Sequence, residues 1–288
     1  MNMLSRHPSA GIRHIRVMLP CCIHGRMSQH IRHQIYIACF LVKVRGVGAA
    51  QLMGTDFRLE RSRDGRVLFD EVLDGPGYDA LAPIVESKGL HLMGIAENGF
   101  RHITNNQRPI ESLADMNGLV IRVAGAQVLK DEYEAWGTNY TTANWSEVYT
   151  GLQTGTYEAQ ENPLPTADAS SISDVQDYVT YWTGVYDCIF FTMNQELYDS
   201  FSPEMQALID EAGAYAANNQ RQLEREGDEE VLAKWAEGGM TVSTLSEEAV
   251  QDFKDAAAGV PAKFVQTCVN LGFDQAEVEA MVAIFVGD

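Results

Sequence analysis

One arginine in an apolar stretch is the first residue whose type and position could do chemistry. Arg122 interrupts the run Leu119 to Val123, which has the length and composition of a buried strand. Burial removes a guanidinium from water, so the charge needs a partner, either an acid of the protein or the acid group of a ligand. Because the planar fork of a guanidinium binds a carboxylate at two points, Arg122 is a candidate for holding an organic acid.

A capped helix follows, and it could add to this chemistry. Asn144 is well placed as an N-cap, with Glu147 three residues further on, and Gly155 suits the left-handed position after the last turn. Trp145 falls in the first turn, where free N–H groups favour anions and an indole can wall an apolar or ring part of a ligand. A tryptophan in such a place is more often part of the core. The strand before this helix, the helix and the extended run after it form one predicted α/β crossover unit.

Three polar residues complete the candidate binding site. Asn162 ends the extended run, where its amide could bind a hydroxyl or carboxylate or simply begin a turn before Pro163. Arg101 lies upstream in the segment ENGFRHITN, as a second ligand contact or as a surface charge on a strand. Asn98, in the same segment, is a further candidate.

These residues belong to three motifs that occur together in one known family. The segments are NGLVIRV (117–123), WSEVYTGLQTG (145–155) and QENP (160–163). In order and spacing the sequence resembles the DctP-like solute-binding proteins of tripartite ATP-independent periplasmic (TRAP) transporters. The resemblance covers Phe57 to the C-terminus and does not include residues 1–56.

The resemblance implies a site, a location and partners. Arg122 would hold the ligand carboxylate, Asn162 would touch the ligand, Trp145 would line the pocket, and Arg101 would supply a second contact. The ligand would be a small organic acid, captured in the periplasm by closure of two lobes. It would be delivered to the small and large integral membrane subunits of a TRAP permease. No cofactor is implied.

The order of predicted elements indicates an α/β fold with mostly parallel sheets. The resemblance specifies a two-lobe architecture like that of periplasmic binding proteins, with connecting strands and a long spanning helix. Ser202, Pro203 and Glu204 predict the start of that helix, which should run to Glu237. Residues 57–288 are expected to form the binding domain with a truncated first lobe, and residues 1–56 to be non-native or disordered. The other predicted strands are 90–95, 100–104, 175–182, 186–193 and 240–244. The other predicted helices are 78–87, 127–136 and one that begins after Ser246. Pro261 is expected to kink or split this last helix.

Composition narrows the classes of function. The net charge is −19, of which residues 1–55 contribute +7 and the remainder −26, so an acidic body argues against nucleic acid as a partner. The five cysteines and the histidines show no metal-ligand spacing. Cys188 and Cys268 could pair in an oxidising compartment, although the sequence favours two buried thiols. No run of the sequence reaches transmembrane length.

The resemblance implies a binding protein that is not an enzyme. Two alternatives stay open. One is an enzyme acting on a small carboxylic acid, for which carboxylates such as Glu161 are present without a recognisable motif. The other is a truncated binding-protein fragment that does not function.

Overall fold

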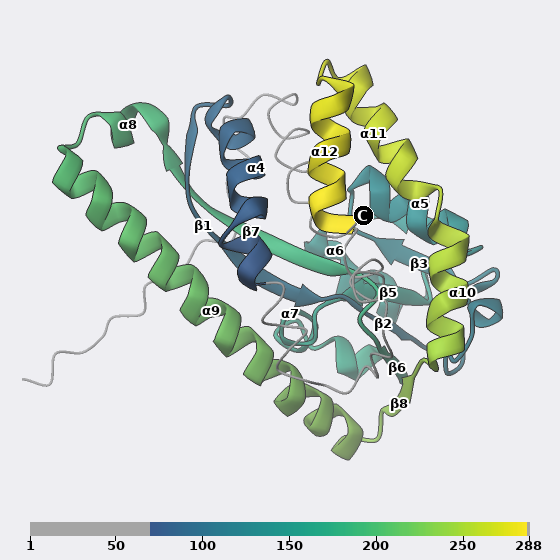
Figure 1. The fold of residues 1–288 in the computed structure, drawn as a ribbon. Coiled ribbons are helices and arrows are strands. Elements are labelled where there is room, and N and C mark those ends of the chain that lie inside the picture. Colours follow the sequence, from purple (N-terminus) through teal and green to yellow (C-terminus); the bar gives the residue numbers. More distant parts are fainter. Residues whose placement is uncertain (1–69, 287–288) are drawn as a thin grey trace, which may run out of the picture.

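Two β-sheets joined by crossing strands form the centre of the computed structural model, which describes residues 70–286 (Figure 1). The smaller sheet pairs β1 (Leu90–Phe100) with β7 (Tyr186–Asn194), antiparallel. The larger sheet has six strands in the order β4-β3-β5-β2-β6-β8. Their bounds are β2 His102–Asn105, β3 Val120–Val123, β4 Asn139–Thr142, β5 Ala159–Asn162, β6 Tyr178–Tyr181 and β8 Thr241–Thr244. In this sheet β3 is parallel to β4 and β5, and β6 is parallel to β8, as predicted; β2 runs antiparallel to both of its neighbours.

Two crossover units build the half of the larger sheet that carries the candidate site. The chain passes from β3 through α5 (Gln127–Ala135) to β4, and from β4 through α6 (Trp145–Gln153) to β5. The sequence predicted one unit here; the short extended run before Asn144 is the additional strand β4. The predicted ends of α6 are confirmed: the Glu147 carboxylate accepts the Asn144 N–H at 3.1 Å, and Gly155 has φ +71°.

Strand β1 is longer than its sequence indicates. The apolar run predicts a strand ending at Ile95, but β1 continues through Glu97 and Gly99 to Phe100. Pairing with β7 holds this part extended, with register shifts between Leu92 and Gly94 and between Glu97 and Gly99. Main-chain hydrogen bonding along a partner strand therefore overrides the local turn signal of Glu-Asn-Gly.

Helix α9 (Pro203–Glu237) spans both sheets as one helix of 35 residues (Figure 1). Its predicted start is confirmed, since Ser202 Oγ accepts the N–H of Met205 at 3.4 Å, and Gly239 follows its end with φ +99°. The helix packs along β1, then against α7 (Leu164–Asp168), and ends next to β8. It approaches β1 closely because Gly213 faces Met93: a methyl group at Gly213 would lie 2.5 Å from the Met93 carbonyl oxygen.

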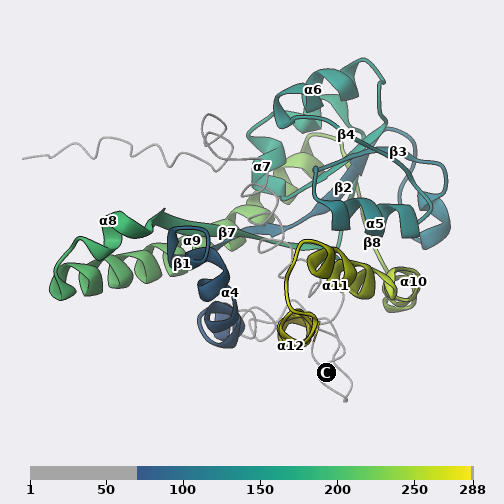
Figure 2. The same cartoon turned by 90° about the horizontal axis from the view of Figure 1, so that it is seen from above.

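The C-terminal helices cover α5 and reach α4, the helix that packs on β1 of the smaller sheet (Figure 2). Helices α10 and α11 pack on α5, and α12 packs on α11 and α4. Pro261 splits the predicted helix, because α10 ends at Ala257 and Pro261 lies in the first turn of α11. The bounds are α4 Pro76–Glu86, α10 Glu247–Ala257, α11 Val260–Asn270 and α12 Gln275–Val286; the short helices are α8 Gln195–Asp199, η2 Leu113–Met116 and η3 Ile172–Val175.

Two apolar clusters form the core. Within residues 70–286 the larger one joins both sheets, from Leu92 on β1 to Val123 on β3. It includes Trp136, whose indole N–H donates to the Phe253 carbonyl at 2.9 Å. The smaller one packs α6, α7 and β6 against Trp235 near the end of α9. The predicted segment 1–56 lies outside the described residues.

Cys188 and Cys268 are both buried free thiols. Between residues 70 and 286, no helix is both long and apolar enough to cross a membrane.

Candidate functional site

Arg122 and Trp145, two of the predicted site residues, lie together. Arg122 is 5% exposed on β3, and its Nε and Nη2 both donate to the carbonyl oxygen of Ala143, at 3.1 and 2.7 Å. The guanidinium carbon lies 5.7 Å from the centre of the half-buried Trp145 ring, which is a cation–π contact. The arginine is thereby held at the point where α6 begins.

Two sources of positive potential meet at the start of α6. One is the Arg122 guanidinium, and the other is the set of first-turn N–H groups at the positive end of the helix dipole. The carboxylate of the exposed Glu147 already accepts one of these groups, the N–H of Asn144. A helix start beside a cation is favourable for an anion, and the Trp145 ring is next to it.

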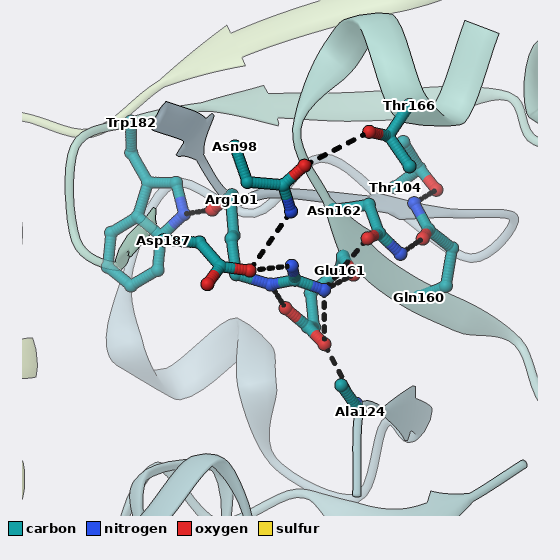
Figure 3. Close-up of polar contacts among 10 residues, drawn as sticks. All are labelled: Asn98, Arg101, Thr104, Ala124, Gln160, Glu161, Asn162, Thr166, Trp182 and Asp187. Carbon is teal, nitrogen blue, oxygen red and sulfur yellow. Dashed lines mark hydrogen bonds and ion pairs between the residues drawn. The ribbon is translucent and has the colours of Figure 1, made fainter. Parts of the chain in front are cut away.

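A second arginine, Arg101, lies at the junction of β1 and β2 in a network of buried polar groups (Figure 3). Its Nε donates to the Glu161 carboxylate, and its Nη1 donates to Asp187 Oδ2 at 2.7 Å. Its Nη2 donates to the Glu161 carbonyl oxygen at 2.9 Å and to Asn162 Oδ1 at 2.8 Å. Asn98 joins the same network, since its Nδ2 donates to Asp187 Oδ2 at 3.0 Å.

Two acidic side chains of this network determine the charge state of Arg101. Burial by itself would lower the pKa of Arg101, but Glu161 and Asp187 outweigh it and raise the pKa above the ordinary value. Arg101 therefore stays charged, and each of its three nitrogens donates to a protein oxygen. In this conformation Arg101 organises its neighbours. Its role as a ligand contact stays a prediction, whereas the alternative of a surface charge is wrong, because Arg101 is 3% exposed.

Asn162 connects the Arg101 network to the strand beside Arg122. Its Oδ1 accepts from Arg101, and its Nδ2 donates to Gln160 Oε1 at 2.8 Å. Gln160 is the register partner of Arg122 between the parallel strands β5 and β3, so the two side chains leave the same face of the sheet. Arg122, Asn162 and Trp145 thus lie at the carboxyl ends of parallel strands, the edge where open α/β sheets bind ligands.

Sequence reasoning missed three buried residues of this site. Asp187 lies 86 residues after Arg101, and nothing in its local sequence marks it as a partner. Glu161 adjoins Asn162 and was considered only as a possible catalytic acid, yet it holds Arg101 and accepts the Ala124 N–H at 3.0 Å. The hydroxyl of Tyr133 is fully buried without a hydrogen-bond partner among residues 70–286, and burial, with the charge of Glu161, raises its pKa well above the usual value. A tyrosine on an amphipathic helix carries no sequence signal of this kind.

The two described histidines have structural contacts. His91 Nε2 lies 2.7 Å from Asp210 Oδ1, and His102 Nδ1 accepts the main-chain N–H of Trp182 at 3.2 Å. Among residues 70–286, no three or more histidine, cysteine, aspartate or glutamate side chains are placed to hold a metal ion.

Comparison with solved structures identifies the class of fold. A TRAP periplasmic solute-binding protein from Sulfitobacter sp. NAS-14.1, solved with bound β-D-galacturonate, superposes with a TM-score of 0.74 over 89% of this chain and 78% of that one, at 23% identity. The galactonate complex of the sugar acid binding protein DctPAm from Advenella mimigardefordensis gives a TM-score of 0.68 at 29% identity, covering 83% and 73%. The fold is that of a two-lobe α/β binding protein, as predicted.

The chain belongs to the DctP family of bacterial extracellular solute-binding proteins, family 7, whose pattern matches residues 56–267. The predicted family is thereby confirmed. It is 32% identical to the 2,3-diketo-L-gulonate-binding periplasmic protein YiaO of Escherichia coli over 63% of this chain and 56% of that protein. It is also 32% identical to the ectoine/5-hydroxyectoine-binding periplasmic protein UehA of Ruegeria pomeroyi, over 67% and 58%. The chain spans just over half the length of these relatives, both of which are named as periplasmic binding proteins.

Proposed function

We propose that this chain is the solute-binding subunit of a TRAP transporter, that it works in the periplasm, and that it captures a small organic acid without turning it over. The observation that carries the proposal is the convergence of Arg122, Trp145 and the start of α6 at the carboxyl ends of β3, β4 and β5. The relatives that bind diketogulonate, ectoine and sugar acids support a ligand of this size and charge.

In this proposal the ligand carboxylate binds at Arg122. A charge-assisted hydrogen bond contributes about 1.5–3 kcal/mol, and micromolar affinity needs about 8 kcal/mol, so Arg122 cannot act alone. The α6 N–H groups add electrostatic stabilisation, Trp145 covers an apolar or ring face, and Asn162 supplies an amide for a hydroxyl or carboxylate.

Capture would require the two sheets to move relative to each other, as in hinged binding proteins. Arg101 lies where β1 becomes β2, and it bonds Asp187 near the start of β7 and Glu161 on β5. The network therefore ties together the strands that pass between the sheets. Its role in the proposed mechanism is to set the geometry in which Asn162 meets the ligand, while the loaded protein delivers the acid to the two membrane subunits of the permease.

A ligand panel tests this function. Purified protein is melted with 2,3-diketo-L-gulonate, ectoine, galacturonate, galactonate and succinate, and any acid that raises the melting temperature is measured by titration calorimetry. Arg122→Ala should abolish binding, because leaving a buried charge unpaired costs about 2–5 kcal/mol or more. Arg122→Lys should keep only part of it, since an ammonium lacks the planar fork.

Lys263→Ala, which removes an exposed positive charge on α11, is the matched control and should bind normally. Unchanged affinity in Arg122→Ala would reject the assigned carboxylate site. Conversion of a bound acid into product would reject the binding-protein function in favour of an enzyme.

A further inference from the structure

Helix α9 is close to the junction of the two sheets at Glu224. A methyl group at Gly99, near the end of β1, would lie 3.6 Å from Glu224 Cγ and 3.4 Å from Pro163 Cβ. Gly99 has φ +105°, a conformation that favours glycine. One turn further along α9, a methyl group at Gly227 would lie 3.3 Å from Pro165 Cγ. The helix therefore has little room to shift without changing its contact with β1 and α7.

Three carboxyl groups come together at this contact. Glu97 on β1 and Asp228 on α9 are each 2% exposed. Glu97 accepts Arg225 Nε at 2.7 Å, and Gln220 bonds both the N–H and the carbonyl oxygen of Glu97. Glu224 is half-buried, but its Oε1 is buried and has no hydrogen-bond partner within residues 70–286.

The surroundings of Glu224 favour the protonated acid. Burial raises its pKa to about 8, and the negative charges of Asp228 and Glu97 act in the same direction. Two other titratable groups lie nearby. Arg225 on α9 donates hydrogen bonds to both Glu97 and Asp70, and Tyr186 on β7 lies close enough to Glu97 to feel its negative charge. The side facing α7 presents Pro163 and Pro165, which are uncharged.

We propose that Glu224 acts as a pH-dependent latch: its protonated side chain is accommodated where α9 meets the β1–β2 junction, and this contact opens more easily as the pH rises, because ionised Glu224 is better solvated once the contact opens. Ionisation in the closed contact would place a third negative charge beside Glu97 and Asp228, with the Oε1 atom of Glu224 shielded from water. Because α9 spans both sheets, a weaker contact here makes it easier for the sheets to move relative to each other. The pH of the surroundings thereby controls the stiffness of the hinge region, whichever acid the protein binds.

Thermal melting between pH 6 and pH 9 tests the latch without any ligand. Wild-type protein should lose stability as the pH rises from 6 to about 8 and change little above it, because over that range the folded state keeps a proton that the unfolded state already releases near pH 4.5. The melting temperature of the wild type should fall over this range by about 3 °C or more beyond that of Glu224→Gln, which keeps the shape of the side chain and cannot ionise. Glu226→Gln, an exposed neighbour on the same helix, should follow the wild type.

Hydrogen exchange locates the effect. After correction for intrinsic exchange rates, amides of residues 96–101 should lose protection between pH 6 and pH 9 in the wild type and keep it in Glu224→Gln. Equal pH dependence of the two proteins would overturn the proposal. Should Glu224→Gln not fold, Asp228→Asn provides a second test. Removing this charge should lower the pH at which the loss of stability levels off, and an unchanged pH of levelling would also overturn the proposal.

Discussion

Arg101 and Glu161, 60 residues apart in the sequence, form an ion pair that is almost completely buried. Their side chains are 4% and 0% exposed, and Glu161 contributes both its carboxylate and its carbonyl oxygen to the same guanidinium. A buried pair of this kind makes the position of each residue dependent on the other, because either charge alone would be costly.

Glu161→Gln should therefore destabilise the protein strongly. Replacing the carboxylate leaves Arg101 with Asp187 as its remaining acidic partner in Figure 3, and breaking a buried pair costs about 3–5 kcal/mol. The free energy of unfolding in urea measures this loss. Glu229→Gln, an exposed change on α9, should stay within about 0.5 kcal/mol of the wild type. A loss as small as that of the control would show that the pair contributes little to the fold.

Trp145→Ala should weaken ligand binding with little effect on stability. The half-buried ring contacts Arg122 and lies at the start of α6, so its loss removes an apolar wall and a cation–π partner. We expect the Kd of the acid found by the panel to rise by about tenfold or more, equivalent to about 1.4 kcal/mol. Trp145→Phe should recover part of the affinity, and Tyr215→Ala, which truncates an aromatic ring 72% exposed on α9, should leave the Kd unchanged. Equal Kd values for the Trp145→Ala variant and the wild type would place the ligand elsewhere.

His102 should make the protein less stable in mild acid. Burial lowers the pKa of this histidine from 6.5 to about 3. Below pH 6.5 the unfolded chain takes up a proton that the folded protein excludes, so this contribution to stability is present above pH 6.5 and is lost as the pH falls toward 3. From pH 7 to pH 5, the free energy of unfolding should decrease by about 2 kcal/mol through this group.

The variant His102→Asn isolates that contribution. Asparagine can still accept the Trp182 N–H but does not titrate, so its unfolding free energy should depend less on pH over the same interval. Parallel pH profiles of the variant and the wild type, measured in urea at several pH values, would contradict the assignment.

Gly213→Ala should destabilise the contact between α9 and β1. Alanine normally favours a helix over glycine by about 1 kcal/mol, but here the added methyl group would lie 2.5 Å from both the Cβ and the carbonyl oxygen of Met93. Since backbone must move to relieve the clash, we expect a net loss of about 1–3 kcal/mol in unfolding free energy. Gly259→Ala is the control, because nothing lies within 4 Å of the new methyl group, and it should cost less than about 0.5 kcal/mol. A more stable Gly213→Ala protein would mean that the helix can move away from the strand.

Local sequence signals were sufficient to predict the ends of helices that have clear capping residues and terminal glycines. The ends of α9 follow from Ser202, Pro203 and the glycines after Glu237, and the start of α6 follows from Asn144 and Glu147. These signals depend on residues within one helical turn, so the sequence by itself carries them. The order of the predicted elements likewise indicates the α/β fold class, and the three motifs indicate the family that the match over residues 56–267 confirms.

Tertiary structure alone decided how the two arginines differ. Both lie in or beside predicted strands and look equivalent in sequence, yet Arg101 meets Glu161 and Asp187, whereas Arg122 bonds a neutral carbonyl group at the start of α6. The partners of Arg101 come from β5 and β7, far along the chain. The environment of Glu224 is likewise created by β1 and by residues next to α7. Charge, burial and pKa depend on groups brought together from distant segments, and no local pattern specifies those groups.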